Sequence, residues 1–330
     1  MNEPILKNNW ERFRAHVDLD IETATKLIAP YTQDQVDELV LLSEGCANTN
    51  YKIIFKNNPP VVIRIYMRDA TALAKELEIH KLVSDKIPVP KHLYVNGKCN
   101  LYTYPYAIIE WVDGKLMREV ILTKDEKSIS ECVFEAGIYL NGLRQITFPQ
   151  GGFFQEKLSI RPFSEEENYL PFVMNLLKDD IVKKSLGSNL LKQVYDLVNS
   201  HSSILPNETE CNLTHADYDP ANILVKKRNG QWKISAVLDW EFAFAGTYLM
   251  DIGMMLRYSH KLPSCYESHF IAGIQKSGFQ LPKNWKKQEK LLDLICLLNL
   301  IHFNPISDRP NLNRDVFSLV MHTVENWESF

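Results

Sequence analysis

The stretch NLTHADYDPANILV (Asn212–Val225) concentrates polar side chains directly before an apolar run. His215, Asp217, Asp219 and Asn222 fall within eight residues, with a proline among them, and Ile-Leu-Val follows at once. A turn rich in Asp, Asn and Pro ahead of a strand is typical of sites carried on loops, and equally typical of an ordinary Asx-type turn. The choice between these two interpretations depends on the sequence around the stretch.

The residues that follow predict a β-hairpin. Asn222–Trp240 reads as two strands joined across Asn229-Gly230, a dipeptide typical of tight hairpin turns. A hairpin brings the residue before its first strand close to the residue after its second, so Asn222 and Asp239 are expected to be neighbours. Amide and carboxylate oxygens suit Mg²⁺, and a nearby carboxylate such as Asp217 can accept the proton of an attacking hydroxyl. The spacing therefore favours phosphoryl transfer.

The rest of the chain divides into a β-rich N-terminal third and a helical remainder. Residues 38–56 read as two strands around a glycine-containing turn, and residues 61–67 as a β-branched strand. Residues 69–86 have helical spacing, two prolines then break the helix, and residues 101–114 read as another strand pair. Beyond them the spacing predicts helices that only the hairpin interrupts, at Lys124–Leu143, Ser164–Lys178, Leu186–His201, Leu249–His260, Glu267–Ser277, Trp285–Phe303 and Arg314–Trp327.

Composition and charge exclude several classes of protein. The net charge of -4 argues against a general nucleic-acid binder. The polar N-terminus does not predict a signal peptide, and the most apolar run, Leu291–Phe303, is too short and too polar to span a membrane. The 6 cysteines are scattered without short paired spacings, which fits reduced thiols. We therefore expect a cytoplasmic protein with neither a membrane nor a nucleic-acid partner.

The two polar motifs together resemble a known superfamily. HADYDPAN and VLDWEFAFAGTYLMDIG (residues 237–253) are similar to the signature of the aminoglycoside phosphotransferase and choline kinase superfamily, which shares the protein-kinase-like fold. The resemblance implies an α+β, two-lobed fold, with an antiparallel β-sheet plus a helix in the N-terminal lobe and a mostly helical C-terminal lobe. It implies a nucleotide-binding lobe over residues 1–112 and a catalytic and substrate-binding lobe over residues 113–330.

The resemblance also assigns roles within the motifs. It implies that Asp217 is the catalytic base and that Asn222 and Asp239 bind Mg²⁺. His215 and Asp251 would brace the catalytic loop, although Asp251 also fits the N-cap of the helix that follows it.

The N-terminal third is similar to the superfamily as well. LSEGCANTNYKI resembles its nucleotide-loop hairpin, with Gly45 and Asn48 at the recurrent positions. Arg64 matches the strand residue that contacts the phosphates, where protein kinases carry Lys. Glu76, on the following helix, would be its ion-pair partner, while Glu78 faces elsewhere on that helix.

The connection between the lobes completes the resemblance. PYAIIEWVDG resembles the hinge, where backbone groups near Glu110 to Val112 would hydrogen-bond the adenine. The implied activity is transfer of the γ-phosphate of ATP, or another NTP, with Mg²⁺, to a hydroxyl of a small molecule. An aminoglycoside, an amino alcohol or a sugar would each fit as acceptor. The sequence does not indicate the oligomeric state.

Two other classes of function stay open. A protein kinase needs an activation segment after its metal-binding Asp, and only eleven residues separate Asp239 from Asp251. A catalytically degenerate, kinase-like nucleotide-binding protein would explain Arg64, but not the retained acidic residues. Acidic side chains for a cationic acceptor would come from Asp219 and Glu241. The acidic run at residues 164–168 fits a capping box as well as a polyamine site.

Overall fold

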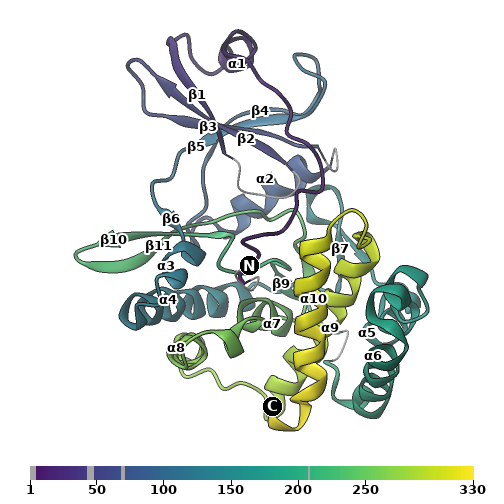
Figure 1. Ribbon diagram of the computed structural model, residues 1–330. Helices are drawn as coiled ribbons and strands as arrows, with labels where there is room; N and C mark the ends of the chain where they lie inside the picture. The colour runs from purple at the N-terminus through teal and green to yellow at the C-terminus, as the bar shows by residue number, and fades with distance from the viewer. Residues whose placement is uncertain (1–4, 43–47, 68–70, 207–208) are drawn as a thin grey trace.

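The computed structural model describes residues 5–42, 48–67, 71–206 and 209–330. The protein has the expected α+β arrangement of two lobes, with an antiparallel sheet at one end of the molecule and a helical body at the other (Figure 1). Across the described ranges, we find no helix with the length and apolar character needed to cross a membrane.

The N-terminal lobe is built on a five-stranded antiparallel sheet. Its strands are β1 (Val36–Leu42), β2 (Thr49–Phe55), β3 (Val61–Ile65), β4 (His92–Asn96) and β5 (Tyr106–Glu110), in the order β1-β2-β3-β5-β4. Every neighbouring pair is antiparallel. All five residues of β3 are buried, as expected for a strand at the centre of a sheet covered on both faces.

Two helices cover the two faces of this sheet. Successive side chains of a strand point to opposite faces, and Tyr106 and Ala107 show this on β5. Tyr106 packs towards α1 (Ile21–Ile28), where its hydroxyl donates to the carbonyl oxygen of Leu27 at 2.9 Å. Ala107 packs with Leu73 of α2 (Ala72–Val83) on the other face. Helix α2 therefore lies between the sheet and the helical lobe (Figure 1).

One strand of this sheet is a correction to the sequence analysis. The expected strand pair within residues 101–114 supplies only β5, while residues 101–104 form bends. The partner of β5 is β4, which lies in the segment that two prolines exclude from helix. Proline is tolerated just before an edge strand, because one side of such a strand needs no ladder partner. The prolines rule out helix there without ruling out strand.

The C-terminal lobe is mostly helical, as expected. Its helices are α3 (Met117–Leu122), α4 (Glu126–Arg144), α5 (Tyr169–Leu176), α6 (Asp180–His201), α7 (Leu249–Leu256), α8 (Cys265–Gln275), α9 (Trp285–Phe303) and α10 (Pro310–Glu325). Helix α9 has the predicted bounds. Helix α6 begins at Asp180, because Asp179 caps it by accepting from the backbone N–H groups of Ile181 and Val182. It is kinked at Gly187 (φ 71), one residue after the predicted start at Leu186.

Short strands hold the polar motifs in place. They are β6 (Lys115–Leu116), β7 (Gly152–Phe154), β8 (Ile160–Pro162), β9 (Asn212–Thr214), β10 (Ile223–Arg228), β11 (Gln231–Val237) and β12 (Phe244–Gly246). The predicted hairpin is confirmed as β10 and β11, and its turn residues Asn229 (φ 51) and Gly230 (φ 79) have the positive φ angles that tight hairpins need. The backbone N–H of Leu238 donates to the carbonyl oxygen of Asn222 at 2.8 Å, so Asn222 and Asp239 lie side by side as predicted.

The N-terminal segment crosses between the two lobes. We call residues 5–19 the strap. At its start, Leu6 is buried in the core of the helical lobe, and the Trp10 indole donates to Asp315 of α10 at 2.9 Å. At its end, the carbonyl oxygen of Val17 accepts from the Tyr51 hydroxyl of β2 at 2.9 Å. The strap is therefore bonded to both lobes and runs from one to the other (Figure 1). The lobe boundary expected after Val112 stays a prediction.

Candidate active site

The loop between β9 and β10 is held by a buried carboxylate. The two oxygens of Asp251, on α7, accept the backbone N–H groups of His215 and Ala216, each at 2.8 Å. Burial raises the pKa of Asp251 to about 7, against the opposing effect of these two hydrogen bonds. The residue at the N-cap of α7 is Tyr248, so the bracing interpretation of Asp251 is correct and the capping one is wrong.

The two hydrogen bonds to Asp251 hold the loop in a strained conformation. Ala216 has φ 63, in the left-handed region that costs an L-residue roughly 1–2 kcal/mol. The bond from its N–H group to Asp251 helps to fix this conformation, which turns the next residue, Asp217, towards the cleft. Strain of this kind is concentrated at functional sites.

His215 is a neutral structural residue. Its Nε2 atom lies 3.0 Å from the carbonyl oxygen of Leu238, and its Nδ1 atom accepts the backbone N–H of Asp217 at 3.2 Å. A carbonyl oxygen only accepts, so Nε2 carries the hydrogen and Nδ1 does not. Burial lowers the pKa of His215, which keeps the ring uncharged. His215 therefore ties the start of the loop to the end of the hairpin.

Asn222 is oriented by Asp217. Its Nδ2 atom donates to the carbonyl oxygen of Asp217 at 2.9 Å and to the Oδ2 atom of the same residue at 2.7 Å. Both amide hydrogens are used in this way, which leaves the side-chain oxygen of Asn222 to act as a ligand. Asp239 follows β11 with φ 65, a second strained residue in the same cleft.

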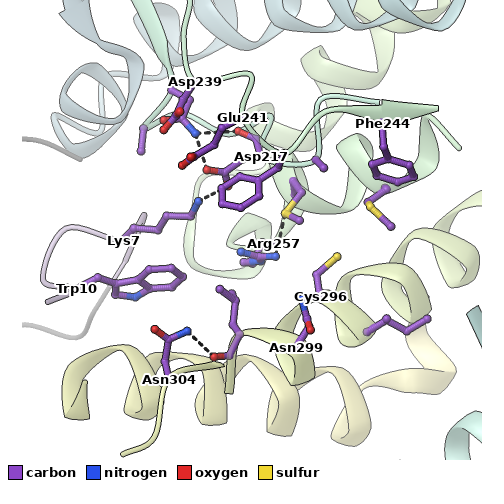
Figure 2. A pocket seen from close by; sticks show the side chains of 18 of the residues that line it. Lys7, Trp10, Asp217, Asp239, Glu241, Phe244, Arg257, Cys296, Asn299 and Asn304 are labelled. Carbon is purple, nitrogen blue, oxygen red and sulfur yellow. Dashed lines mark hydrogen bonds and ion pairs between the residues drawn. The ribbon is translucent and has the colours of Figure 1, made fainter. Parts of the chain in front are cut away.

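Lys7 of the strap reaches the same carboxylate, and the sequence gives no sign of it. Its ammonium lies 2.6 Å from Asp217 Oδ1 (Figure 2). It also pairs with Asp219. Burial raises the pKa of Asp217, but Lys7 and the bond from Asn222 more than offset burial, so the pKa lies below its usual range. For Asp219 burial prevails, and its pKa is raised. Lys7 therefore keeps Asp217 ionised.

Arg64 joins the sheet lobe to the cleft. One of its terminal nitrogens lies 2.7 Å from Asp239 Oδ1 and 3.4 Å from Glu76 Oε2, so the predicted contact with Glu76 is present. The two carboxylates raise the pKa of Arg64 well above its usual value, although burial opposes them. Glu78 points away from the site, as expected, and pairs with Lys81 at 2.6 Å.

Four further residues were predicted to contact the nucleotide: Gly45, Asn48, Glu110 and Val112. Gly45 lies outside the described residues. Asn48 accepts the backbone N–H of Met67 at 3.2 Å through its side-chain oxygen, which ties β2 to the end of β3. The N–H of Glu110 donates to the carbonyl oxygen of Lys91 at 2.8 Å, so that donor is already used within the sheet. Val112 lies two residues beyond the end of β5.

A cavity of about 590 Å³ lies beside these groups in the helical lobe (Figure 2). Eight aromatic side chains contribute to its wall: Trp10, Phe13, Phe153, Phe163, Tyr169, Phe172, Phe242 and Phe244. Met250, Met254, Ile295 and Leu300 add further apolar surface. The wall also carries polar groups, both near Asp217, as with Asp239 and Glu241, and on the far side, as with Asn299 and Asn304 (Figure 2).

One carboxylate of the acidic run at residues 164–168, that of Glu167, reaches this cavity but is already paired. That residue lines the cavity, but both of its oxygens accept from Arg161, at 2.8 and 2.9 Å. One of them also accepts the backbone N–H of Ser164 at 2.8 Å, which confirms the predicted capping box. Asp219 is likewise engaged, by Lys7 and by the backbone N–H of Ala221 at 2.7 Å.

The comparisons with known proteins agree with this geometry. The profile of the phosphotransferase enzyme family matches residues 38–282. No curated protein matches the chain by sequence at a significant level.

Several solved structures share the fold. A crystal structure of aminoglycoside phosphotransferase APH(4)-Ia is 17% identical, with a TM-score of 0.67 over 93% of this chain and 99% of that one. A thermostable mutant of that enzyme, in complex with AMP-PNP and hygromycin B, is 18% identical, with a TM-score of 0.65 over 91% and 96%. Wild-type aminoglycoside 2'-phosphotransferase-IIIa, in complex with GDP, is 14% identical, with a TM-score of 0.69 over 94% and 99%.

Proposed function

The chain belongs to the phosphotransferase enzyme family, and from that premise we propose that it transfers the γ-phosphate of ATP, or of another nucleoside triphosphate, to a hydroxyl of a small molecule. The observation that carries this proposal is the convergence of Asp217, Asn222 and Asp239 at one cleft, with Arg64 reaching it from the sheet lobe. The nucleotide and nucleotide-analogue complexes of the similar structures support a nucleotide as the phosphate donor.

Asp217 is the proposed base. It would accept the proton of the acceptor hydroxyl as that oxygen attacks the γ-phosphate. Lys7 and Asn222 each occupy one of its oxygens, but a carboxylate oxygen can accept two hydrogen bonds, which leaves capacity for the hydroxyl. Lys7 also places a positive charge beside the expected path of the phosphoryl group, where preorganised cations stabilise the transition state.

Asn222 and Asp239 fit the proposed Mg²⁺. The side-chain oxygen of Asn222 is left over from its two bonds to Asp217, and one oxygen of Asp239 is left over from its bond to Arg64. Both are hard oxygen ligands of the kind that Mg²⁺ prefers, and the ion would neutralise charge on the nucleotide phosphates. Arg64, held by Glu76, would contact the same phosphates from the other lobe.

The cavity favours an acceptor with an apolar body over a polycation. Its aromatic wall would bury apolar surface, and the carboxylates of Asp217, Asp239 and Glu167 already pair with Lys7, Arg64 and Arg161. A polyamine would have to compete with these cations for the three carboxylates. We therefore propose that the acceptor is a hydroxyl compound with an apolar, ring-bearing portion, and not an aminoglycoside.

A matched series of acceptors tests this proposal. Methyl, phenyl and octyl glycosides of one sugar offer the same hydroxyls with increasing apolar surface. Burying a group of phenyl size contributes roughly 1.5–3 kcal/mol, so we expect kcat/KM to rise about 10–100-fold from the methyl to the phenyl compound. The measurement is the rate of nucleoside diphosphate release with each glycoside, with kanamycin and with choline.

The outcomes separate the rival functions. Phosphorylation of the amines alone would refute the apolar acceptor but not the phosphotransferase. Transfer of labelled phosphate to a pool of peptides and folded proteins, with none to small molecules, would support a protein kinase. Mg²⁺-dependent nucleotide binding with no transfer to any pool would support the catalytically degenerate alternative.

Lys7 provides a prediction about pH. The base must be ionised to accept a proton, and Lys7 holds the pKa of Asp217 below its usual range. In a Lys7→Met variant, burial would act unopposed by the ammonium and the pKa of Asp217 would rise. The acidic limb of the kcat/KM profile is therefore expected to move to higher pH, so that activity is lost sooner as the pH falls.

The charge-conserving variant is the control for this prediction. Lys7→Arg keeps a cation beside Asp217, so its acidic limb should stay close to that of the unmodified protein. An unshifted limb in Lys7→Met, with unchanged thermal stability, would show that Lys7 does not set the ionisation of the base.

A further inference from the structure

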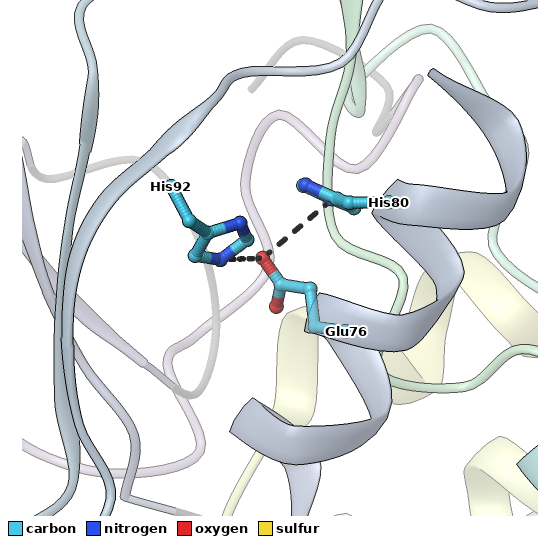
Figure 3. Close-up of side chains that lie close together, drawn as sticks. All are labelled: Glu76, His80 and His92. Carbon is cyan, nitrogen blue, oxygen red and sulfur yellow. Dashed lines mark ion pairs between the residues drawn. The ribbon is translucent and has the colours of Figure 1, made fainter. Parts of the chain in front are cut away.

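Three potential metal ligands converge on the side of α2 that faces β4. Glu76 and His80 lie one turn apart on α2, and His92 begins β4 (Figure 3). The Nε2 atoms of His80 and His92 lie 3.9 and 3.8 Å from the same oxygen of Glu76, and the three ligand atoms lie within 4.8 Å of one another. Among the described parts of the chain, this is the one group of three or more His, Cys, Asp or Glu side chains with such convergence.

The polar atoms of the cluster are buried without partners. His80 is 8% exposed and Glu76 2% exposed. Neither His80 Nε2 nor His92 Nε2 makes a hydrogen bond, because both are too far from the carboxylate, and both are buried. A buried polar atom with no partner costs roughly 1–3 kcal/mol, so two of them facing one carboxylate oxygen need a group between them.

The orientation of His80 suits a cation at this position. Its Nδ1 atom lies 3.2 Å from the carbonyl oxygen of Pro90. A carbonyl oxygen only accepts, so Nδ1 carries the ring hydrogen, and Nε2 presents a lone pair to Glu76. Imidazoles that bind metals almost always donate their other N–H to a carbonyl or carboxylate in this way.

We propose that Glu76, His80 and His92 bind one divalent transition-metal ion of the Zn²⁺ class. Two imidazole nitrogens and one carboxylate oxygen suit Zn²⁺ and its first-row neighbours, whereas Mg²⁺ and Ca²⁺ prefer oxygen ligands. Bonds of about 2.0–2.1 Å in a tetrahedral site put ligand atoms roughly 3.4 Å apart. The distances of 3.9 and 3.8 Å from Glu76 to the two histidines would therefore each shorten by about half an ångström.

The surrounding charge is compatible with such an ion. The positive group closest to the cluster is Arg64, which lies 3.4 Å from the second oxygen of Glu76. Arg64 is also paired with Asp239 at 2.7 Å, so two carboxylates accompany it. Glu76 would then bind the ion with one of its oxygens and keep its contact with Arg64 through the other oxygen.

The ion would connect two parts of the sheet lobe. Glu76 and His80 come from α2, and His92 comes from the edge strand β4. A shared ion would fix α2 against β4 and hold Glu76 in position to orient Arg64. This inference concerns a site separate from Asn222 and Asp239, and its test does not require phosphotransferase activity.

The test is metal binding by the full chain, without a polyhistidine tag. After EDTA treatment, the protein is titrated with Zn²⁺ by calorimetry in millimolar Mg²⁺, so that Mg²⁺ competes for oxygen ligands elsewhere. We expect one Zn²⁺ per chain, a Zn²⁺-dependent rise in Tm, and visible absorption of tetrahedral type when Co²⁺ is used instead. His80→Gln and His92→Gln should each weaken Zn²⁺ binding by more than about tenfold.

A second histidine pair supplies the matched control. His260 and His322 stack with ring centroids 3.6 Å apart in the helical lobe, and no other described His, Cys, Asp or Glu joins them in a group of three. His260→Gln should therefore keep the Zn²⁺ affinity and the rise in Tm. No stoichiometric Zn²⁺ binding by the unmodified chain, or unchanged binding by His92→Gln, would overturn the proposal. His92 lies on an edge strand, so this variant remains informative if His80→Gln fails to fold.

Discussion

Replacing Asp217 with Asn is expected to lower kcat by about 10²–10⁴-fold while leaving nucleotide binding intact. The Asn side chain keeps the shape of Asp217 and can still accept the hydrogen bond that Asn222 donates at 2.7 Å. It has no basicity, so the acceptor hydroxyl would lose the group that takes its proton. The measurements are steady-state phosphoryl transfer and calorimetric titration of the nucleotide.

Asp219→Asn is the control for this change. Asp219 shares Lys7 with Asp217, so both variants remove one negative charge from the same cluster. Asn can also keep the bond that Asp219 accepts from the backbone N–H of Ala221. Asp219→Asn should lose far less activity, because only Asp217 is the proposed base. Equal losses in the two variants would show that the charge of the cluster matters and that proton transfer by Asp217 does not.

Replacing Asp239 with Ala is expected to remove the part of nucleotide affinity that depends on Mg²⁺. A carboxylate between metal and phosphates contributes only when the metal is present. Loss of a group in the outer shell of a metal site already costs about 10–100-fold in metal affinity, and a direct ligand should cost at least as much. Titration of ATP in Mg²⁺ and in EDTA measures the difference directly.

The EDTA arm makes this experiment specific. In EDTA the variant should bind ATP about as well as the unmodified protein, because no metal bridges the site in either. Asn222→Ala should show the same defect in a milder form, since a neutral amide offsets less charge. If Mg²⁺ strengthened ATP binding by Asp239→Ala as much as it does in the unmodified chain, Asp239 would not be a ligand.

The part of the candidate site that the sequence predicts well is local in the chain. Asn222 and Asp239 are joined by one hairpin, so the turn signal at Asn229-Gly230 was enough to place them together. Trp285–Phe303 was predicted with its observed bounds because a long helix carries its periodicity throughout.

The parts that were missed depend on contacts between distant residues. Lys7 and Asp217 are 210 positions apart, and nothing near Lys7 in the sequence marks it as part of a site. The strands β7, β8, β9 and β12 have three residues each, too few for a period-2 pattern to show. For β4, the prolines removed the helix signal, and the paired residues of β5 lie 10 to 17 positions further along the chain.

The strap also constrains how the two lobes can move. It connects them at a place apart from the chain connection that leads from β5 to β6 (Figure 1). The contact of Arg64 with Asp239 ties the lobes together at a further place, inside the cleft. Wide opening of the cleft therefore requires the bonds of Trp10 or Val17 to break. In an enzyme whose turnover is limited by product release, detachment of the strap from one lobe would then limit the rate.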